Sequence, residues 1–122
     1  MEKLTAKEEE IMNHFWRLGP LFVRELLQEY DQPKPHFNTL STVVRGLVEK
    51  GFLSYHAYGP THQYYPLISA EQFKAQSLKG VLDRYYEKSI FSAVSALVDN
   101  NEITTDELKE LLELIDRGEE KL

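Results

Sequence analysis

Apolar positions in the first third of the chain recur every three or four residues, the spacing that places side chains on one face of a helix. Thr5 and Glu8 have the spacing of a capping box, which predicts a helix that begins there and ends at Gly19-Pro20. A shorter apolar repeat predicts a second helix from Val23 to about Tyr30, which the proline-rich loop DQPKP ends.

A third helix is predicted within the stretch PHFNTLSTVVRGLVEKGFL, residues 35–53, closing at Gly51. Its apolar stripe consists of Leu40, Val43, Val44, Leu47 and Val48. The opposite face carries Asn38, Ser41, Thr42 and Arg45. Asn, Ser and Thr are poorer helix formers than the Lys and Glu of an ordinary solvated face. A solvated face is one interpretation, and a contact surface is the other.

The hydrophobic period changes after residue 51. The segments FLSYHAY and HQYYPLI are rich in aromatic residues and predict a β-hairpin with its turn at Gly59-Pro60-Thr61. The hairpin side chains suited to contact sugar and phosphate are Tyr55, His56, Tyr58, His62, Gln63 and Tyr64. Alternation along the strands allows some hairpin residues to lie in the core instead, with Tyr55 or Tyr65 as the expected ones. Three helices followed by a hairpin predict a winged helix-turn-helix domain over residues 1–68.

Residues 69–122 are predicted to be helical. Ser69 begins a capping box for a helix that is expected to run to about Val98, and Thr104 begins another for a last amphipathic helix. The fold class is therefore mainly α with a small β-hairpin. The apolar surface of the long helix is too wide for the surface of a small domain, which predicts a helical dimerisation region and a homodimer. A monomer with both helices folded back on the N-terminal half is the alternative. The candidate interface residues are Leu78, Leu82, Tyr85, Phe91, Val94, Leu108, Leu111, Leu112 and Ile115.

The charge distribution changes the interpretation of the third helix. A net charge of −6 over 122 residues argues against a nucleic-acid partner. However, residues 1–68 carry seven basic and eight acidic side chains, whereas residues 69–122 carry seven and twelve. Between Gln32 and Ala70 the only acidic residue is Glu49. The polar face of the third helix therefore lies in a locally positive part of an acidic protein.

Composition argues against several classes of function. There is no cysteine, so disulfides, thiolate metal sites and thiol catalysis are excluded. No apolar run is long enough for membrane insertion and the N-terminus is polar, so a cytoplasmic protein is expected. Ser41 and His36 lack a nucleophile motif, and no glycine-rich phosphate loop is present, so neither an enzyme nor a cofactor is expected. His56 and His62 flank the hairpin turn, but two imidazoles without a carboxylate make a poor metal site.

DNA binding fits the third helix for a geometric reason. A helix that enters the major groove needs a core stripe on one side and compact donors and acceptors on the other. The candidate contacts are Asn38, Thr39, Ser41, Thr42 and Arg45 on the helix, with His56 and His62 on the hairpin. The competing hypothesis is a winged-helix module that uses the same face to contact a protein.

The sequence also resembles the penicillinase-repressor (BlaI/MecI-like) family of winged-helix regulators over nearly its whole length. The segments that resemble the family are LTAKEEEIMNHFW, NTLSTVVRGLVEKGFL, HQYYPLIS and ITTDELKELLELID. The resemblance implies a homodimeric repressor that binds a double-stranded inverted-repeat operator, with the third-helix residues named above facing it. It also implies a membrane sensor protease as a partner that leads to repressor cleavage. This chain has Ala96-Leu97 where well-known members have an Asn-Phe bond, and Gly46 where a basic residue is common.

Overall fold

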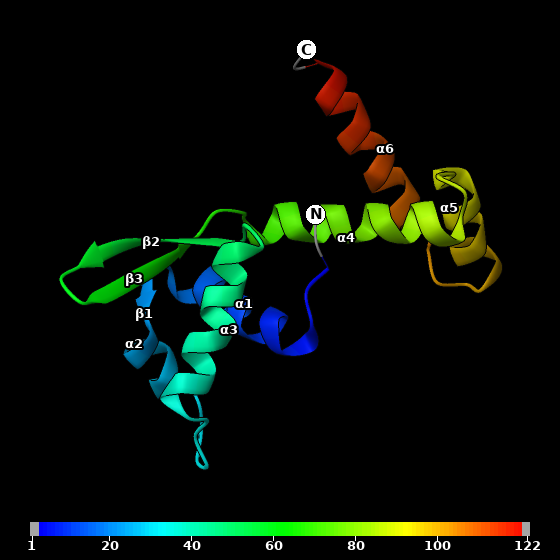
Figure 1. Cartoon of the computed structure of the whole chain (residues 1–122). Helices are drawn as coiled ribbons and strands as arrows, with labels where there is room; N and C mark the ends of the chain where they lie inside the picture. The colour runs from blue at the N-terminus through cyan, green and yellow to red at the C-terminus, as the bar shows by residue number, and fades with distance from the viewer. Residues whose placement is uncertain (1–2, 121–122) are drawn as a thin grey trace. The chain divides into compact units, whose positions relative to one another are not determined.

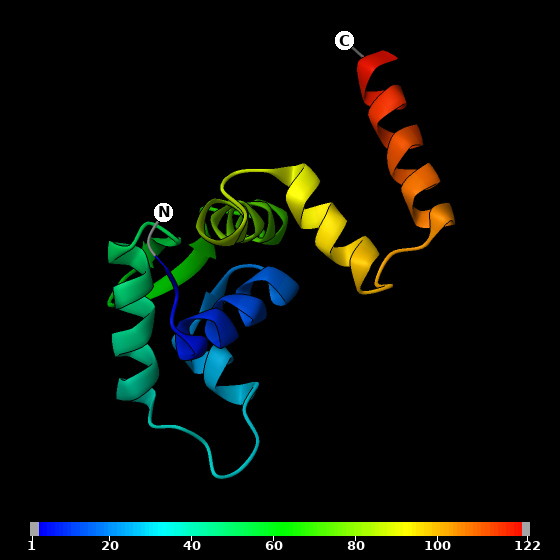
Figure 2. The same ribbon diagram turned by 90° about the vertical axis from the view of Figure 1, so that its right-hand side faces the viewer.

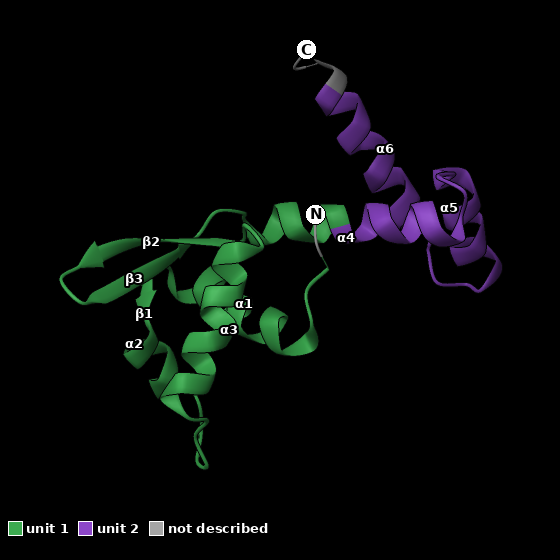
Figure 3. Ribbon diagram, in the orientation of Figure 1, with its two compact units in different colours: residues 1–76 green, residues 77–122 purple. Residues whose placement is uncertain are grey.

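A computed structural model describes residues 3–120 of the chain (Figure 1). In chain order the elements are α1 (Ala6–Leu18), β1 (Leu21–Phe22), α2 (Val23–Gln28), α3 (Phe37–Glu49), β2 (Leu53–Tyr58), β3 (Thr61–Pro66), α4 (Ala70–Tyr85), α5 (Ile90–Asp99) and α6 (Thr105–Glu120). They divide into two compact units, residues 1–76 and 77–122 (Figure 3). This architecture confirms the predicted fold class of a winged helix-turn-helix followed by a helical region.

Helix α1 begins and ends where the sequence predicts. The Thr5 N–H donates to the Glu8 carboxylate at 2.8 Å, and the Glu8 N–H donates to the Thr5 hydroxyl at 3.2 Å, so the capping box is complete. Gly19 ends the helix with a φ of 86°, a conformation that costs glycine little. The helix buries one face, formed by Ile11, Met12 and Phe15.

Helices α2 and α3 form the helix-turn-helix. Helix α2 ends at Gln28, two residues before the predicted end, and a long loop then extends away from the helices before α3 begins (Figure 2). Helix α3 fully buries Leu40, Val44 and Leu47. Val43 and Val48 pack against the same core while partly exposed, which confirms the predicted stripe.

The hairpin that follows α3 belongs to a three-stranded antiparallel sheet with the order β1-β3-β2. The two-residue strand β1 was not predicted, because a segment of that length has no detectable period. It places Leu21 opposite Tyr64. The hairpin turn consists of Gly59 and Pro60 alone, since Thr61 already pairs with Tyr58, and Gly59 has a φ of 61°.

The structure changes which hairpin tyrosine belongs to the core of the first unit. Tyr64 is buried, while Tyr55 is 43% exposed and Tyr65 lies partly exposed. The expectation that Tyr55 or Tyr65 is the core tyrosine is therefore wrong, and Tyr64, expected among the contact residues, takes that place. Tyr55 pairs with Tyr64 and shares its face of the sheet, but β3 is the central strand, with the unpredicted β1 beside it, whereas β2 is an edge strand.

The chain after the hairpin is fixed to α1. The indole N–H of Trp16 donates to the carbonyl oxygen of Ile68 at 2.8 Å. Phe73, in the first turns of α4, lies 5.3 Å from the Trp16 ring and 6.1 Å from the Phe52 ring, measured between centroids. The start of α4 therefore belongs to the packing of the first unit.

The predicted helix from Ser69 to Val98 is interrupted, so that expectation is wrong. Glu87 and Lys88 have φ values of 50° and 66°, which end α4, and the Lys88 N–H donates to Leu82 O at 3.0 Å. Ser89 then caps α5, accepting from the Ser92 N–H at 3.1 Å. A helix that ends without glycine or proline leaves little signal in a sequence. Ser89, a preferred N-cap residue type, was the one local signal for the start of a new helix.

Candidate nucleic-acid interface

The polar face of α3 is open to solvent. Asn38, Thr39, Thr42 and Arg45 are exposed, and Ser41 is partly exposed. The Thr42 hydroxyl donates to the Asn38 carbonyl at 2.9 Å and accepts a long hydrogen bond of 3.4 Å from Arg45 Nη2. The structure therefore gathers all five predicted helix residues on accessible surface, with the guanidinium held near the helix by Thr42.

The N-terminus of α3 is left open. His36 occupies the N-cap position and makes no side-chain hydrogen bond to the first turn. By contrast, Thr5, Ser69, Ser89 and Thr104 cap α1, α4, α5 and α6 through their hydroxyls. The backbone N–H groups at the start of α3 consequently remain available to an external anion such as a phosphate.

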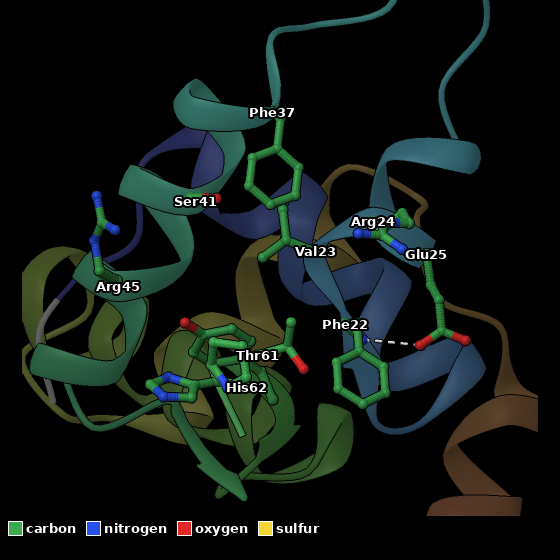
Figure 4. Close-up of a pocket in the computed structure, with 11 residues that line it drawn as sticks. Phe22, Val23, Arg24, Glu25, Phe37, Ser41, Arg45, Thr61 and His62 are labelled. Carbon is green, nitrogen blue, oxygen red and sulfur yellow. Dashed lines mark hydrogen bonds between the residues drawn. The ribbon is translucent and has the colours of Figure 1, made fainter. Parts of the chain in front are cut away.

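A groove with a volume of about 540 Å³, here termed the interface groove, lies between α3, the start of α2 and the hairpin tip (Figure 4). Its lining residues are Phe22, Val23, Arg24, Glu25, Phe37, Ser41, Arg45, Pro60, Thr61, His62 and Tyr64. Ser41 and Arg45 are the two predicted helix contacts that line it. His62 is the predicted hairpin contact that does so.

The groove combines apolar walls with basic groups. Arg24 and Arg45 line it, and its single acidic lining residue, Glu25, accepts a hydrogen bond from the Phe22 N–H at 2.9 Å. Burial raises the pKa of Tyr64, and the nearby positive charge of Arg45 partly opposes that rise. Arg45 thus places a positive charge close enough to act on a residue that lines the groove.

The two hairpin histidines are separated. His56 lies opposite Gln63 and His62 lies opposite Ala57, and side chains of consecutive pairs point to opposite faces of a sheet. His62 stacks on Tyr55 with centroids 4.1 Å apart, whereas His56 stacks on Tyr65 at 4.8 Å. They cannot approach each other across the strands, and no group of three His, Asp or Glu residues in the described part of the chain could hold a metal ion.

Several groove residues were not singled out from the sequence. Phe37 lies three residues before Leu40 and seven before Val44, so it continues the apolar side of α3 toward its N-terminus, and that spacing was a signal that could have been used. Phe22 and Arg24 belong to the segment around β1, whose pairing no pattern revealed. Their place in the groove depends on the sheet register, which is a tertiary property.

The predicted interface residues of the second unit are largely uncovered. Exposed fractions reach 67% at Tyr85 and 82% at Phe91, and α4 and α5 contain no buried residue. Leu78, Leu111, Leu112 and Ile115 are exposed, and Leu82, Val94 and Leu108 are partly exposed. Among the described residues, no helix is long and apolar enough to cross a membrane.

Comparison with known proteins gives one family. The model of the penicillinase repressor family matches residues 4–117, which include most of both units. The methicillin resistance regulatory protein MecI of Staphylococcus aureus strain N315 is 23% identical over 116 residues, covering 94% of each chain. The penicillinase repressor of Bacillus licheniformis is 23% identical over 93% of this chain and 90% of its own. A 16.5 kDa protein of Latilactobacillus sakei is 24% identical over 93% and 78%.

Proposed function

Because the chain belongs to the penicillinase repressor family, we propose that it is a homodimeric transcriptional repressor that binds an inverted-repeat operator through α3 and the hairpin. Two of its relatives are named a methicillin resistance regulatory protein and a penicillinase repressor. The regulated genes are accordingly expected to be of the β-lactam-resistance type.

The observation that carries the DNA contact is the composition of the exposed face of α3. Asn38, Thr39, Thr42 and Arg45 are solvent-accessible, and Glu49 is the one acidic residue of the helix, in its last turn. Amide, hydroxyl and guanidinium groups are the donors and acceptors that contact phosphates and base edges. The open N-terminus of α3 adds free backbone N–H groups at the end of this face.

The hairpin provides the second contact. Tyr58 at its tip is 55% exposed, and its ring lies 5.8 Å from that of Phe22. His62 and Arg45 line the interface groove together. A DNA strand that passes from α3 to the hairpin would therefore meet basic and aromatic side chains along its path, with Arg24 at the far side of the groove.

The homodimer is supported by the exposed apolar side chains of the second unit. A single chain leaves Leu78, Tyr85 and Phe91 uncovered, a condition that is costly in water and that a second copy would relieve. Two copies related by a two-fold axis would present two α3 helices to half-sites about one helical turn apart, or a multiple of it. A membrane sensor protease as a further partner stays a prediction. Ala96-Leu97, at the position where well-known family members have an Asn-Phe bond, lies within α5.

The test is a gel-shift salt series on DNA from upstream of the gene. A protein that contacts about six to ten phosphates loses roughly 10³- to 10⁵-fold in affinity between about 50 and 200 mM salt, because counterions are released. Arg45→Ala should weaken binding about tenfold and reduce the salt dependence. Arg17→Ala is the matched control, because Arg17 lies on α1 and pairs with Glu29 at 2.8 Å.

Two outcomes would contradict the proposal. Absent binding at low salt, or binding that does not respond to salt, would favour a module that contacts a protein. Equal losses in Arg45→Ala and Arg17→Ala would mean that the α3 face is not the DNA contact.

A further inference from the structure

Phe37, the first residue of α3, is a large apolar side chain that the core does not use. Its exposed fraction is 48%, whereas Phe15 and Phe52 of the same unit are at 0% and 1%. It belongs neither to the core cluster nor to the partly buried residues packed against that cluster. Because a half-exposed phenyl ring contributes only part of the free energy of burial, fold stability does not account for this choice of residue.

The ring of Phe37 forms part of the apolar wall of the interface groove. Figure 4 shows it directed toward Val23, with Ser41 and Arg45 following at intervals of four residues along the same helix. Residues at that spacing share one side of a helix. This side of α3 is therefore apolar at the N-terminal end, polar in the middle and positively charged further along.

The position and chemistry of Phe37 indicate which group of the DNA it contacts. Recognition helices contact base edges mainly with their N-terminal residues, and Phe37 is the first residue of α3. A phenyl ring neither donates nor accepts a conventional hydrogen bond, so it can discriminate only by apolar contact. Among the groups that bases present in the major groove, the thymine 5-methyl is the apolar one, and Phe is among the side chains that contact it.

We propose that Phe37 is a specificity-determining residue whose ring packs on the 5-methyl group of a thymine in each operator half-site. The inference rests on the proposed function, since it requires α3 to lie in the major groove. It assigns one base position to Phe37 and leaves phosphate contacts to Arg45 and the hairpin.

The experiment compares thymine with uracil, which lacks only the methyl group. The full-length protein first selects its site from a random duplex pool, and each thymine of the selected site is then replaced by uracil. For the wild type, one position per half-site should show a loss of roughly threefold to tenfold, the amount expected for one buried methyl group. Phe37→Ala should bind thymine and uracil duplexes equally at that position.

Two further variants complete the experiment. Leu18→Ala is the matched control, because Leu18 is an exposed apolar residue at the end of α1, and it should retain the wild-type discrimination. Phe37→Leu keeps an apolar side chain with a shorter reach, so it should discriminate less than the wild type. Thermal unfolding verifies that each variant is folded.

Each result has a distinct meaning. Wild-type binding without any uracil-sensitive position overturns the role of Phe37 and leaves the proposed function intact. If, in that case, Phe37→Ala still weakens binding to thymine and uracil duplexes equally, the ring contacts deoxyribose and not a thymine methyl group. Discrimination that persists in both Phe37 variants also overturns it. Failure to select any duplex is a failure of the proposed function itself.

Discussion

The carboxylate of Glu8 lies where the start of α1 meets the end of α3. It accepts hydrogen bonds from Lys50 Nζ at 2.7 Å and from the Thr5 N–H at 2.8 Å. Burial alone would raise the pKa of this carboxyl, but the hydrogen bonds from Lys50 and Thr5 and the Lys50 charge outweigh it, so the pKa lies below the ordinary 4.5. The ionised group therefore stabilises the fold above about pH 4.5, and this contribution is lost as the pH falls through the folded-state pKa.

Glu8→Gln should lower the free energy of unfolding by about 2 kcal/mol near neutral pH, because the charged hydrogen bond to Lys50 is lost. Glutamine still completes the capping box, so helix α1 should persist. Below the folded-state pKa the wild-type carboxyl is protonated, and the two proteins should become nearly equal in stability. Urea unfolding at neutral and acidic pH measures both differences.

The control for this prediction is Glu9→Gln, since Glu9 is exposed in the same helical turn. It should change stability little at either pH. A Glu8→Gln deficit of the same size at both values of pH would contradict the role of the ionised pair.

At the scale of elements, α3 carries a glycine, Gly46, at a partly exposed position in its last third. Gly46 follows Thr39 and Thr42 at intervals of seven and four residues, so the three share one stripe of the helix. A Cβ added at Gly46 would have no atom within 4 Å. The glycine thus lowers helix propensity without relieving a close contact, and it leaves this stripe of α3 uncharged.

Substitution of Gly46 should separate helix stability from DNA affinity. Gly46→Ala is expected to raise the free energy of unfolding by about 0.5–1 kcal/mol with little effect on DNA binding. Gly46→Arg should also tighten DNA binding and steepen the dependence of log K on log salt by about 1 per protomer. Thermal unfolding and the gel-shift salt series provide the measurements, and an arginine variant that binds like the alanine variant would contradict the placement of this stripe on DNA.

The elements show what a sequence alone can and cannot predict. The Thr5–Glu8 capping box located the start of α1, and the 3.6-residue period located α3, since both signals are local. The break after Tyr85 was missed because Glu87 and Lys88 adopt left-handed conformations, which are uncommon for Glu and Lys and are not predicted from residue type. The groove was found only in part, because Phe22 and Arg24 reach it through the pairing of β1, which depends on distant residues.

The second unit has an apolar surface out of proportion to its size. Residues from all three of its helices, among them Leu78, Phe91 and Leu112, expose more than half of their surface. Monomeric proteins rarely leave such residues uncovered together. In contrast, the first unit has a closed core to which Trp16 and Phe73 contribute from its edge.

Truncation after Gln76 should give a folded monomer with much weaker operator binding. The truncated chain keeps Phe73 on Trp16, so its core is complete. Each half-site would then be bound independently, and affinity for the full operator should fall by roughly a hundredfold, the loss expected when bivalency is removed. Sedimentation and gel shift measure the two effects.

A matched variant keeps the full length. Phe91→Asp introduces a charge at the large apolar side chain that is the most exposed among the described residues of the second unit, and it should also give a monomer with weakened operator binding. If both altered proteins remain dimeric, the interface does not lie in the second unit.

The hydrogen bond from Trp16 to Ile68 also equips the molecule with a built-in optical reporter. The chain has a single tryptophan, and its indole is fixed within the first unit at 2.8 Å from the Ile68 oxygen. Tryptophan emission therefore follows the unfolding of residues 1–76, whereas far-ultraviolet circular dichroism follows the helices of both units. If the two signals change at different temperatures, and only the circular dichroism transition shifts with protein concentration, dissociation of the dimer is distinguished from unfolding of the first unit without any label.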